Sequence, residues 1–191
     1  MPSRTPGSYR ITNRDQIDAL ASPVRLEIVD GVRLAGPCSI AELGRLLGRP
    51  ADGLYYHMRV LVRVGLLVPC GARETTRRDE ILYRTPARRI RTPLEQSTAA
   101  KRSGVVRIFS ALLRLTDRDF RSAALGKRRC RGIRSARIKG WLTADELREV
   151  QQHVDAIIDV FHRDRDEPAR RRRLYAATTF LVPLEPNTRT R

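Results

Sequence analysis

The sequence is poor in cysteine and in long apolar runs, and both shortages limit what this chain can be. Its three cysteines, Cys38, Cys70 and Cys130, lie far apart and form no C-x-x-C pair. They predict neither a disulfide framework nor a thiolate metal site, since each needs several cysteines at short spacing. No apolar run approaches the roughly 18 residues that cross a bilayer, and the first residues lack the apolar core of a signal peptide. We expect a cytoplasmic protein with reduced thiols and no membrane contact.

Acidic residues are also scarce beside basic ones. There are 21 Asp and Glu against 38 Lys and Arg, a formal net charge of +17 over 191 residues. This surplus favours a polyanionic partner, because each neutralised phosphate releases counterions. An arginine-rich composition also follows from a genome of high GC content, so charge by itself does not decide the function.

Motifs of catalysis and cofactor binding are absent. The sequence has no Gly-rich phosphate loop, no paired carboxylates in an apolar context and no Ser/His/Asp constellation at a recognisable spacing. Its three histidines, His57, His153 and His162, are isolated from one another, whereas a metal site needs converging ligands. We expect no enzyme activity, no catalytic residue, no cofactor and no metal.

Residues 39–65 have the pattern of two helices joined by a tight turn. Ser39 and Glu42 stand three residues apart, as in a reciprocal N-terminal capping box, and Gly48-Arg49-Pro50 ends the first helix. The second helix places its apolar residues on one face: Leu54, Met58, Leu61 and Val64. A helix pair of this kind can hold its second helix in the major groove of DNA.

Two short apolar strands are expected after the helix pair, on either side of a loop over 71–79. Arg73, Arg77 and Arg78 project from this loop, in which Ala72 is the one apolar residue. We expect the hairpin to be a wing whose arginines contact phosphate or enter the minor groove, which positions a protein without specifying sequence. A solvated loop is the alternative.

The remaining segments give the predicted architecture. A short helix is expected over 14–21, and a second one begins at Ser22-Pro23, with Ser as N-cap and Pro at the first helical position. The proline-containing stretch 85–93 is predicted to be a linker. Further elements are predicted in the second half: a helix over 94–115, a strand over 134–142, a helix from the capping box Thr143/Glu146 and a strand over 174–182.

The predicted fold class is mainly α with small β, a winged helix-turn-helix followed by a C-terminal α+β domain. We expect a flexible tail over 1–12, a DNA-binding domain over 13–92 and a dimerisation or effector domain over 93–186.

Two motifs resemble the ArsR-like winged helix-turn-helix transcriptional regulators: Ser22-Pro-Val-Arg25 and Tyr56-His-Met-x-x-Leu-x-x-x-Gly-Leu66. The resemblance covers about residues 13–85 and implies a homodimeric, sequence-specific DNA binder, usually a repressor released by a signal. Metal sensors of that family often carry Cys-x-Cys near the first helix of the pair, and residues 40–46 contain no cysteine. Metal sensing by that route is therefore not expected. The blocks at 139–143 and 174–176 resemble an added C-terminal domain of some such regulators.

The candidate DNA-contacting residues lie at the start of the first helix, around the start and along one face of the second, and in the wing: Ser39, Ala51, Asp52, Gly53, Tyr55, Tyr56, Arg59, Arg63, Arg73, Arg77 and Arg78. Arg59 can donate two hydrogen bonds to guanine O6 and N7, or it can contact phosphate. The tyrosines can bond phosphate, stack within a dimer or contact bases. We expect Asp52 to cap its helix, and a packed neutral role for His57 is favoured over a pH switch.

Two features of the second half leave alternatives open. The apolar stripe over 104–115, which includes Val105, Ile108 and Leu113, is a candidate dimer contact, with ordinary core packing as the alternative. The basic clusters over 127–139 and 170–173 can extend a DNA footprint, bind an acidic ligand or be solvated, and solvation is the simplest interpretation.

These patterns predict a sequence-specific DNA-binding transcriptional regulator, a homodimeric repressor with a ligand-responsive or dimerising C-terminal domain. Its partner would be double-stranded DNA with a palindromic operator, and an unknown small-molecule effector would release it. The alternative is a non-specific basic nucleic-acid-binding protein of the nucleoid or RNA-binding kind. The capped helix pair distinguishes the two, since non-specific binding needs charge but not that geometry.

Overall fold

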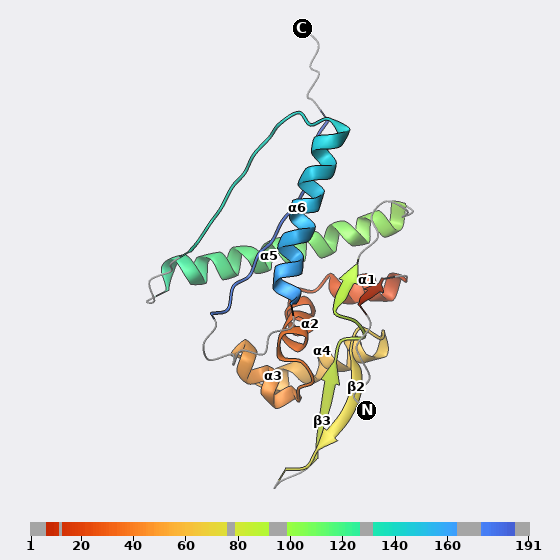
Figure 1. Cartoon of the computed structure of the whole chain (residues 1–191). Coiled ribbons are helices and arrows are strands. Elements are labelled where there is room, and N and C mark those ends of the chain that lie inside the picture. The colour runs from red at the N-terminus through yellow and green to blue at the C-terminus, as the bar shows by residue number, and fades with distance from the viewer. Residues whose placement is uncertain are drawn as a thin grey trace. The chain divides into compact units, whose positions relative to one another are not determined.

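Helices make up most of this computed structural model, which describes residues 7–11, 13–75, 79–91, 99–126, 132–163 and 173–185. The chain forms two compact units, residues 1–120 and 121–191. The elements follow one another along the chain as β1 (Ser8–Arg10), α1 (Arg14–Leu20), α2 (Pro23–Ala35), α3 (Ile40–Leu47), α4 (Asp52–Arg63), β2 (Val68–Arg73), β3 (Glu80–Arg84), β4 (Arg89–Arg91), α5 (Ala99–Leu125) and α6 (Ala144–His162) (Figure 1). No helix among the described residues is both long enough and apolar enough to cross a membrane.

The predicted helix pair is confirmed as α3 and α4. The backbone N–H of Glu42 donates to Ser39 Oγ (3.2 Å), and the backbone N–H of Ser39 donates to Glu42 Oε2 (2.9 Å), so the capping box is complete. Gly48 ends α3 in the left-handed region, with φ of 63°, a conformation that glycine adopts without steric cost. The expectation that Asp52 caps α4 is wrong, because Ala51 is the N-cap and no side chain caps that end.

One apolar core joins the helices of the first unit. Leu43 of α3 and Leu54 and Leu61 of α4 are fully or almost fully buried, together with Ile28 of α2. Val105 and Ile108 of α5 belong to the same core. Val105 and Ile108 of the predicted stripe are therefore core packing within one chain, whereas Leu113 is 53% exposed.

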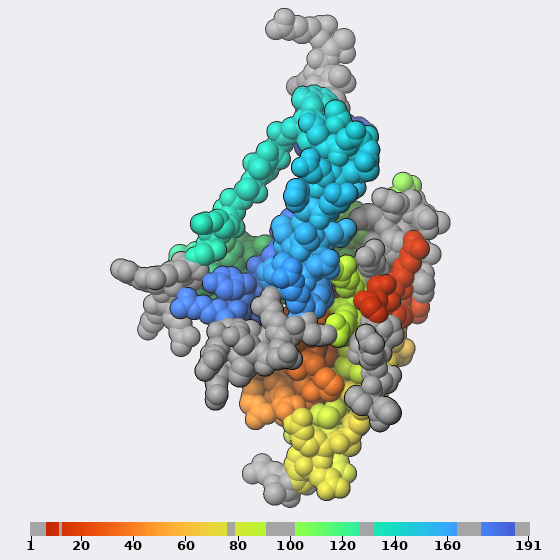
Figure 2. Space-filling view, in the orientation of Figure 1, coloured from red at the N-terminus to blue at the C-terminus, as the bar shows by residue number. Residues whose placement is uncertain are grey.

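The wing is an antiparallel hairpin of β2 and β3, with Val68 opposite Arg84 and Arg73 opposite Glu80. Cys38 extends it by one bridge, since its backbone exchanges two hydrogen bonds with Tyr83, at 3.1 and 2.9 Å. The wing (yellow to yellow-green) projects beyond the neighbouring helices α2 and α3 (Figure 2). The predicted loop over 71–79 is shorter than expected, because β2 continues to Arg73.

A second small sheet corrects two expectations. β1 and β4 pair in parallel, with Ser8 opposite Arg89 and Arg10 opposite Arg91. The predicted tail over 1–12 is therefore wrong for β1, and the predicted linker over 85–93 is wrong for β4. The physical reason is burial: Ile11 packs into the core, and Thr85 and Ala87 are also buried.

The helix α5 differs in length from its prediction over 94–115. It continues to Leu125, and the first five residues of the predicted range lie outside the described part of the chain. Its last turns carry no glycine or proline before Gly126, so nothing local ends the helix at residue 115.

The second unit contains α6, which begins at the predicted capping box. The backbone N–H of Thr143 donates to Glu146 Oε2 (2.7 Å), and that of Glu146 donates to Thr143 Oγ1 (3.3 Å). The strands predicted over 134–142 and 174–182 are wrong: no described residue of either segment pairs in a sheet. Strand propensity reflects how a side chain packs within a sheet more than an intrinsic backbone preference, so β-branched and aromatic residues alone do not make a strand. The α+β prediction for this unit is therefore not met by its described residues, whereas the mainly helical fold with an N-terminal winged helix-turn-helix is confirmed.

The core position of α4 gives a stability prediction. Leu61→Ala should lower the free energy of unfolding by about 2–5 kcal/mol, because Leu61 is 0 % exposed and its loss leaves a cavity. Leu46→Ala is the control, since Leu46 of α3 is 42 % exposed and should change stability by less than about 0.5 kcal/mol. Urea denaturation followed by circular dichroism measures both, and equal losses would contradict this placement of α4.

Candidate nucleic-acid interface

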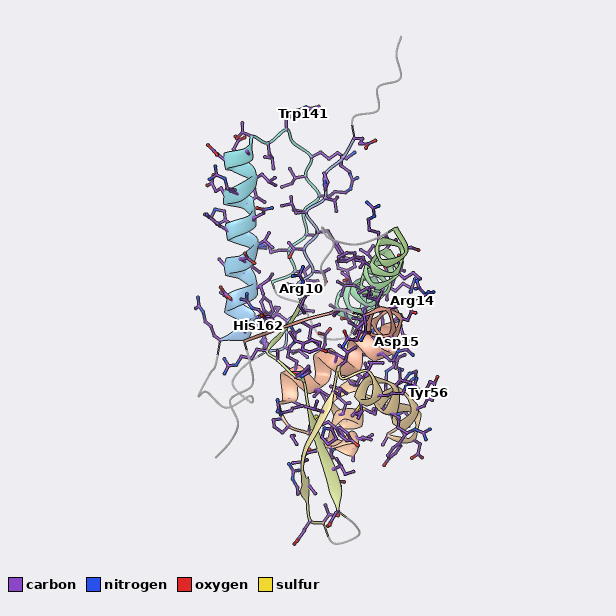
Figure 3. All side chains as sticks on the ribbon, turned by 90° about the vertical axis from the view of Figure 1, so that its right-hand side faces the viewer. Arg10, Arg14, Asp15, Tyr56, Trp141 and His162 are labelled. Atoms are coloured by element: carbon purple, nitrogen blue, oxygen red, sulfur yellow. The ribbon has the colours of Figure 1, made fainter. Side chains whose placement is uncertain are left out.

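The second helix of the pair, α4, presents a polar face opposite its buried one. Leu54, Met58 and Leu61 lie in the core, so helical periodicity turns Arg59 and the tyrosines outward. The outward side chains at helical spacing are Tyr55, Tyr56, Arg59 and Arg63, all exposed. Figure 3 shows Tyr56 on the outer side of α4. The structure thus brings together the four residues predicted for this helix face.

A groove lies between this face of α4 and the wing. It has a volume of about 270 Å³. Its lining comes from α4, from the wing and from the start of α3: Tyr55, Met58, Arg59, Val62, Arg63, Pro69, Tyr83 and Ile40. The helix and the wing therefore form one surface, with an apolar floor and two guanidinium groups among its lining.

The charges of Arg59 and Arg63 are not compensated within the chain. Neither takes part in an ion pair with any residue that the structure describes. A buried or paired arginine would be held in place by its carboxylate partner, whereas these two are available to an external anion. Both guanidinium groups border the groove, where such an anion would meet them together.

Arg73 has a different place from the one predicted. It ends β2 instead of projecting from the loop, and its Nη1 lies 2.5 Å from Glu42 Oε1. The hydrogen bond from the Ser39 backbone lowers the pKa of Glu42, and the Arg73 guanidinium lowers it further. Arg73 therefore ties the wing to the N-terminus of α3. Arg77 and Arg78, the other predicted wing contacts, lie outside the described residues.

The remaining candidates surround the start of the helices. Ser39 is only 2 % exposed and its hydroxyl is engaged in the cap, so the prediction of a surface contact there is wrong. Asp52 and Gly53 are exposed in the first turn of α4, and Ala51 is half-buried. The negative charge of Asp52 lies at the positive end of the helix dipole.

His57 is packed beside the core, in agreement with the favoured interpretation. Its ring meets that of Tyr56 edge to face, with 5.4 Å between centroids. Burial lowers the pKa of His57, and the positive charges of Arg25 and Arg49 lower it further. Nδ1 is buried and accepts or donates no hydrogen bond among the described residues. The neutral ring is therefore the form that this environment favours.

Sequence reasoning missed the wing's share of the groove and the Arg73–Glu42 pair. Pro69 and Tyr83 line the groove together with Tyr55, Arg59 and Arg63 of α4. The sequence placed Tyr83 in a β-prone segment. Which face of the hairpin its side chain occupies depends on the register between β2 and β3, which the sequence does not give. The Arg73–Glu42 pair joins residues 31 positions apart, a separation at which no local spacing rule applies.

The lowered pKa of Glu42 gives a pH prediction. A carboxyl whose pKa falls on folding contributes stability that is present above its unfolded pKa, near the ordinary 4.5, and is lost as the pH falls through the folded value. Glu42→Gln should therefore cost about 1 kcal/mol at neutral pH, and this difference from wild type should shrink below pH 4.5. Glu74→Gln, an equal charge change at an exposed wing residue, is the control. Urea denaturation across the pH range measures it, and a difference that stays constant on acidification would contradict it.

Three comparisons bear on what this arrangement is. Residues 20–70 match a family model described as a helix-turn-helix domain. No curated protein matches the sequence.

Several solved structures resemble the chain at low identity. The transcriptional regulator homologue protein from Pyrococcus horikoshii OT3 is 21% identical, over 53% of this chain and 91% of that one, with a TM-score of 0.33. Disulfide-formed AbfR is 12% identical over 76% and 80%, with a TM-score of 0.32. The transcriptional regulator Tm0710 from Thermotoga maritima is 13% identical over 78% and 82%, with a TM-score of 0.28.

The family model spans α2, α3, α4 and the start of β2, which are the elements that build the exposed arginine and tyrosine face. Residues 20–70 thus have the helix-turn-helix fold of the model that they match, and the hairpin of β2 and β3 adds a wing to it.

Proposed function

We propose that this protein is a sequence-specific DNA-binding regulator of transcription, in which α4 enters the major groove. The observation that carries the proposal is the pair Arg59 and Arg63, which have no ion-pair partner among the described residues and border one groove with the wing. They stand on the second helix of a capped helix-turn-helix domain, the element that reads base edges in such domains.

The residues of α4 are expected to contact either bases or phosphates, according to their distance from the start of the helix. Arg59 can donate two hydrogen bonds to guanine O6 and N7, and it shares its exposed face with Tyr55 and Tyr56. Arg63 lies one turn further along, where a phosphate contact suits its position. Ala51, Asp52 and Gly53 precede or begin the helix and would lie nearest to the bases or to the adjoining backbone.

The wing would lie along the DNA phosphates beside the major groove that α4 enters. Arg77 and Arg78 supply the charges for such a contact, which positions the protein without reading sequence. Arg73 would hold the wing against α3 through Glu42, so that the two binding elements keep one spacing.

A second copy would complete the binding unit. Val106, Leu113 and Phe120 of α5 recur at seven-residue spacing and are 59%, 53% and 50% exposed, on a different side of the helix from the buried Val105 and Ile108. An apolar stripe of this kind suits a two-fold contact, and a two-fold protein suits a palindromic operator. It shares Leu113 with the stripe predicted over 104–115, whose Val105 and Ile108 lie in the core instead.

The resemblance to ArsR-like proteins supports a regulatory role. On that basis we propose a homodimeric repressor whose second unit either responds to an effector or contributes to the dimer interface. The net charge of +17 supports the alternative, a non-specific basic nucleic-acid binder.

Selection from a random pool of DNA duplexes, at near-physiological salt, separates these functions. We expect an inverted repeat to be enriched and to be bound by two chains. Equal retention of all sequences, lost as the salt concentration rises, would leave the non-specific binder.

Two arginine variants test the division of roles on the selected duplex. Arg59→Ala should relax the preference at particular base pairs by about 1–3 kcal/mol. Arg77→Ala should instead weaken binding to all sequences and lower the slope of log affinity against log salt by about one. Titrations by fluorescence anisotropy at several salt concentrations measure both. An unchanged base preference in Arg59→Ala would remove Arg59 from the residues that read sequence.

A further inference from the structure

Glu27, on α2, holds two arginines from different parts of the first unit. Its Oε2 accepts from Arg49 Nε (3.0 Å) and lies 2.9 Å from Arg49 Nη2, and its Oε1 lies 2.7 Å from Arg118 Nη1. The Glu27 side chain is only 11% exposed. This one largely buried carboxylate therefore joins two parts of the first unit. Arg49 lies in the turn between α3 and α4, and Arg118 lies on α5.

The turn that holds Arg49 has little freedom. The backbone N–H of Arg49 donates to the carbonyl of Gly44 (2.9 Å). A Cβ at Gly44 would lie 2.8 Å from the Arg49 carbonyl oxygen, so the two backbones are in close contact there. Because α4 begins at Asp52, only two residues separate Arg49 from the helix. A displacement of Arg49 would therefore shift the start of α4.

The other end of the link is fixed on α5. Arg118 Nη2 also lies 2.7 Å from Asp119 Oδ1, so the guanidinium is held between the carboxylates of Asp119 and Glu27. Asp30 lies nearby on α2, where it pairs with Arg33 at 2.9 Å and interacts with the carboxylates of Asp119 and Glu27. Carboxylates are thus crowded at this junction, and each arginine there offsets repulsion between them.

We propose that Glu27 is a positioning residue that transmits the position of α5 to the turn before α4. It rests on the proposed DNA binding by α4. Anything that moves α5, such as a second copy on its exposed stripe, would change the placement of α4 and thereby the affinity for DNA.

The substitution Glu27→Gln should change the affinity for DNA in opposite directions, depending on whether Glu27 acts by positioning α4 or only by its charge. It removes a negative charge, so a purely electrostatic effect would tighten binding to DNA. Loss of positioning would instead weaken binding to the selected duplex, by roughly two- to thirty-fold. Fluorescence anisotropy on that duplex measures the sign, and tighter or equal binding would overturn the proposal.

Two variants on α5 form a matched pair. Arg118→Gln breaks the link at a residue on α5, and we expect it to weaken binding as Glu27→Gln does. Arg114→Gln removes the same charge one turn earlier, from an exposed residue that makes no ion pair within the described part of the chain, and should have a smaller effect. In the double variant Glu27→Gln/Arg118→Gln the two losses should not add. Equal losses for Arg114→Gln and Arg118→Gln would overturn the proposal. This pair also serves if Glu27→Gln does not fold.

Hydrogen exchange tests the link without DNA. In Arg118→Gln the backbone amides of Arg49 and of residues 51–54 should exchange faster, while those of β2 and β3 stay as in wild type and in Arg114→Gln. A uniform rise across the first unit would show a general loss of stability and overturn the proposal. A wild-type chain that binds no duplex would instead refute the proposed DNA binding, and the exchange rates would still decide whether Glu27 links α5 to the turn.

Discussion

The burial of one face of α4 is the constraint on which the rest of the first unit depends. Leu54, Met58 and Leu61 enter a core shared with α2, α3 and α5. Once those three are inside, the helical period leaves no choice about which residues face outward. The wing, the cap of α3 and the link to α5 all act on a helix whose rotation about its own axis is already determined by packing.

The acidic residues of the first unit serve mainly to hold its framework. Glu42 pairs with Arg73, Glu27 with Arg49 and Arg118, and Asp18 with Arg14 and Arg107. Each pair joins or steadies elements away from the outward face of α4. Arg14, Arg49, Arg73, Arg107 and Arg118 thus have carboxylate partners, whereas Arg59 and Arg63 have no such partner among the described residues. Net charge alone conceals this division.

The sequence was sufficient wherever structure is set by neighbours in the chain. The capping boxes at Ser39 and Thr143 were predictable because their donors and acceptors lie three residues apart, and the outward row of α4 followed from period alone. Sequence reasoning failed where a distant partner decides. β1 and β4 form a sheet only together, and the described residues of the β-prone segments over 134–142 and 174–182 belong to no sheet. For the same reason neither the Arg73–Glu42 pair nor the double link at Glu27 was visible.

The parallel pairing of β1 with β4 has a consequence for the limits of the domain. The match to a helix-turn-helix model begins at residue 20, yet the strand that precedes α1 pairs with the one that follows the wing. A fragment that began at residue 20 and ran on past the wing would keep β4 without its partner β1, and an unpaired edge strand is a template for association with other chains. The smallest piece that folds without this hazard starts at or before Ser8, well upstream of the helices that define the motif.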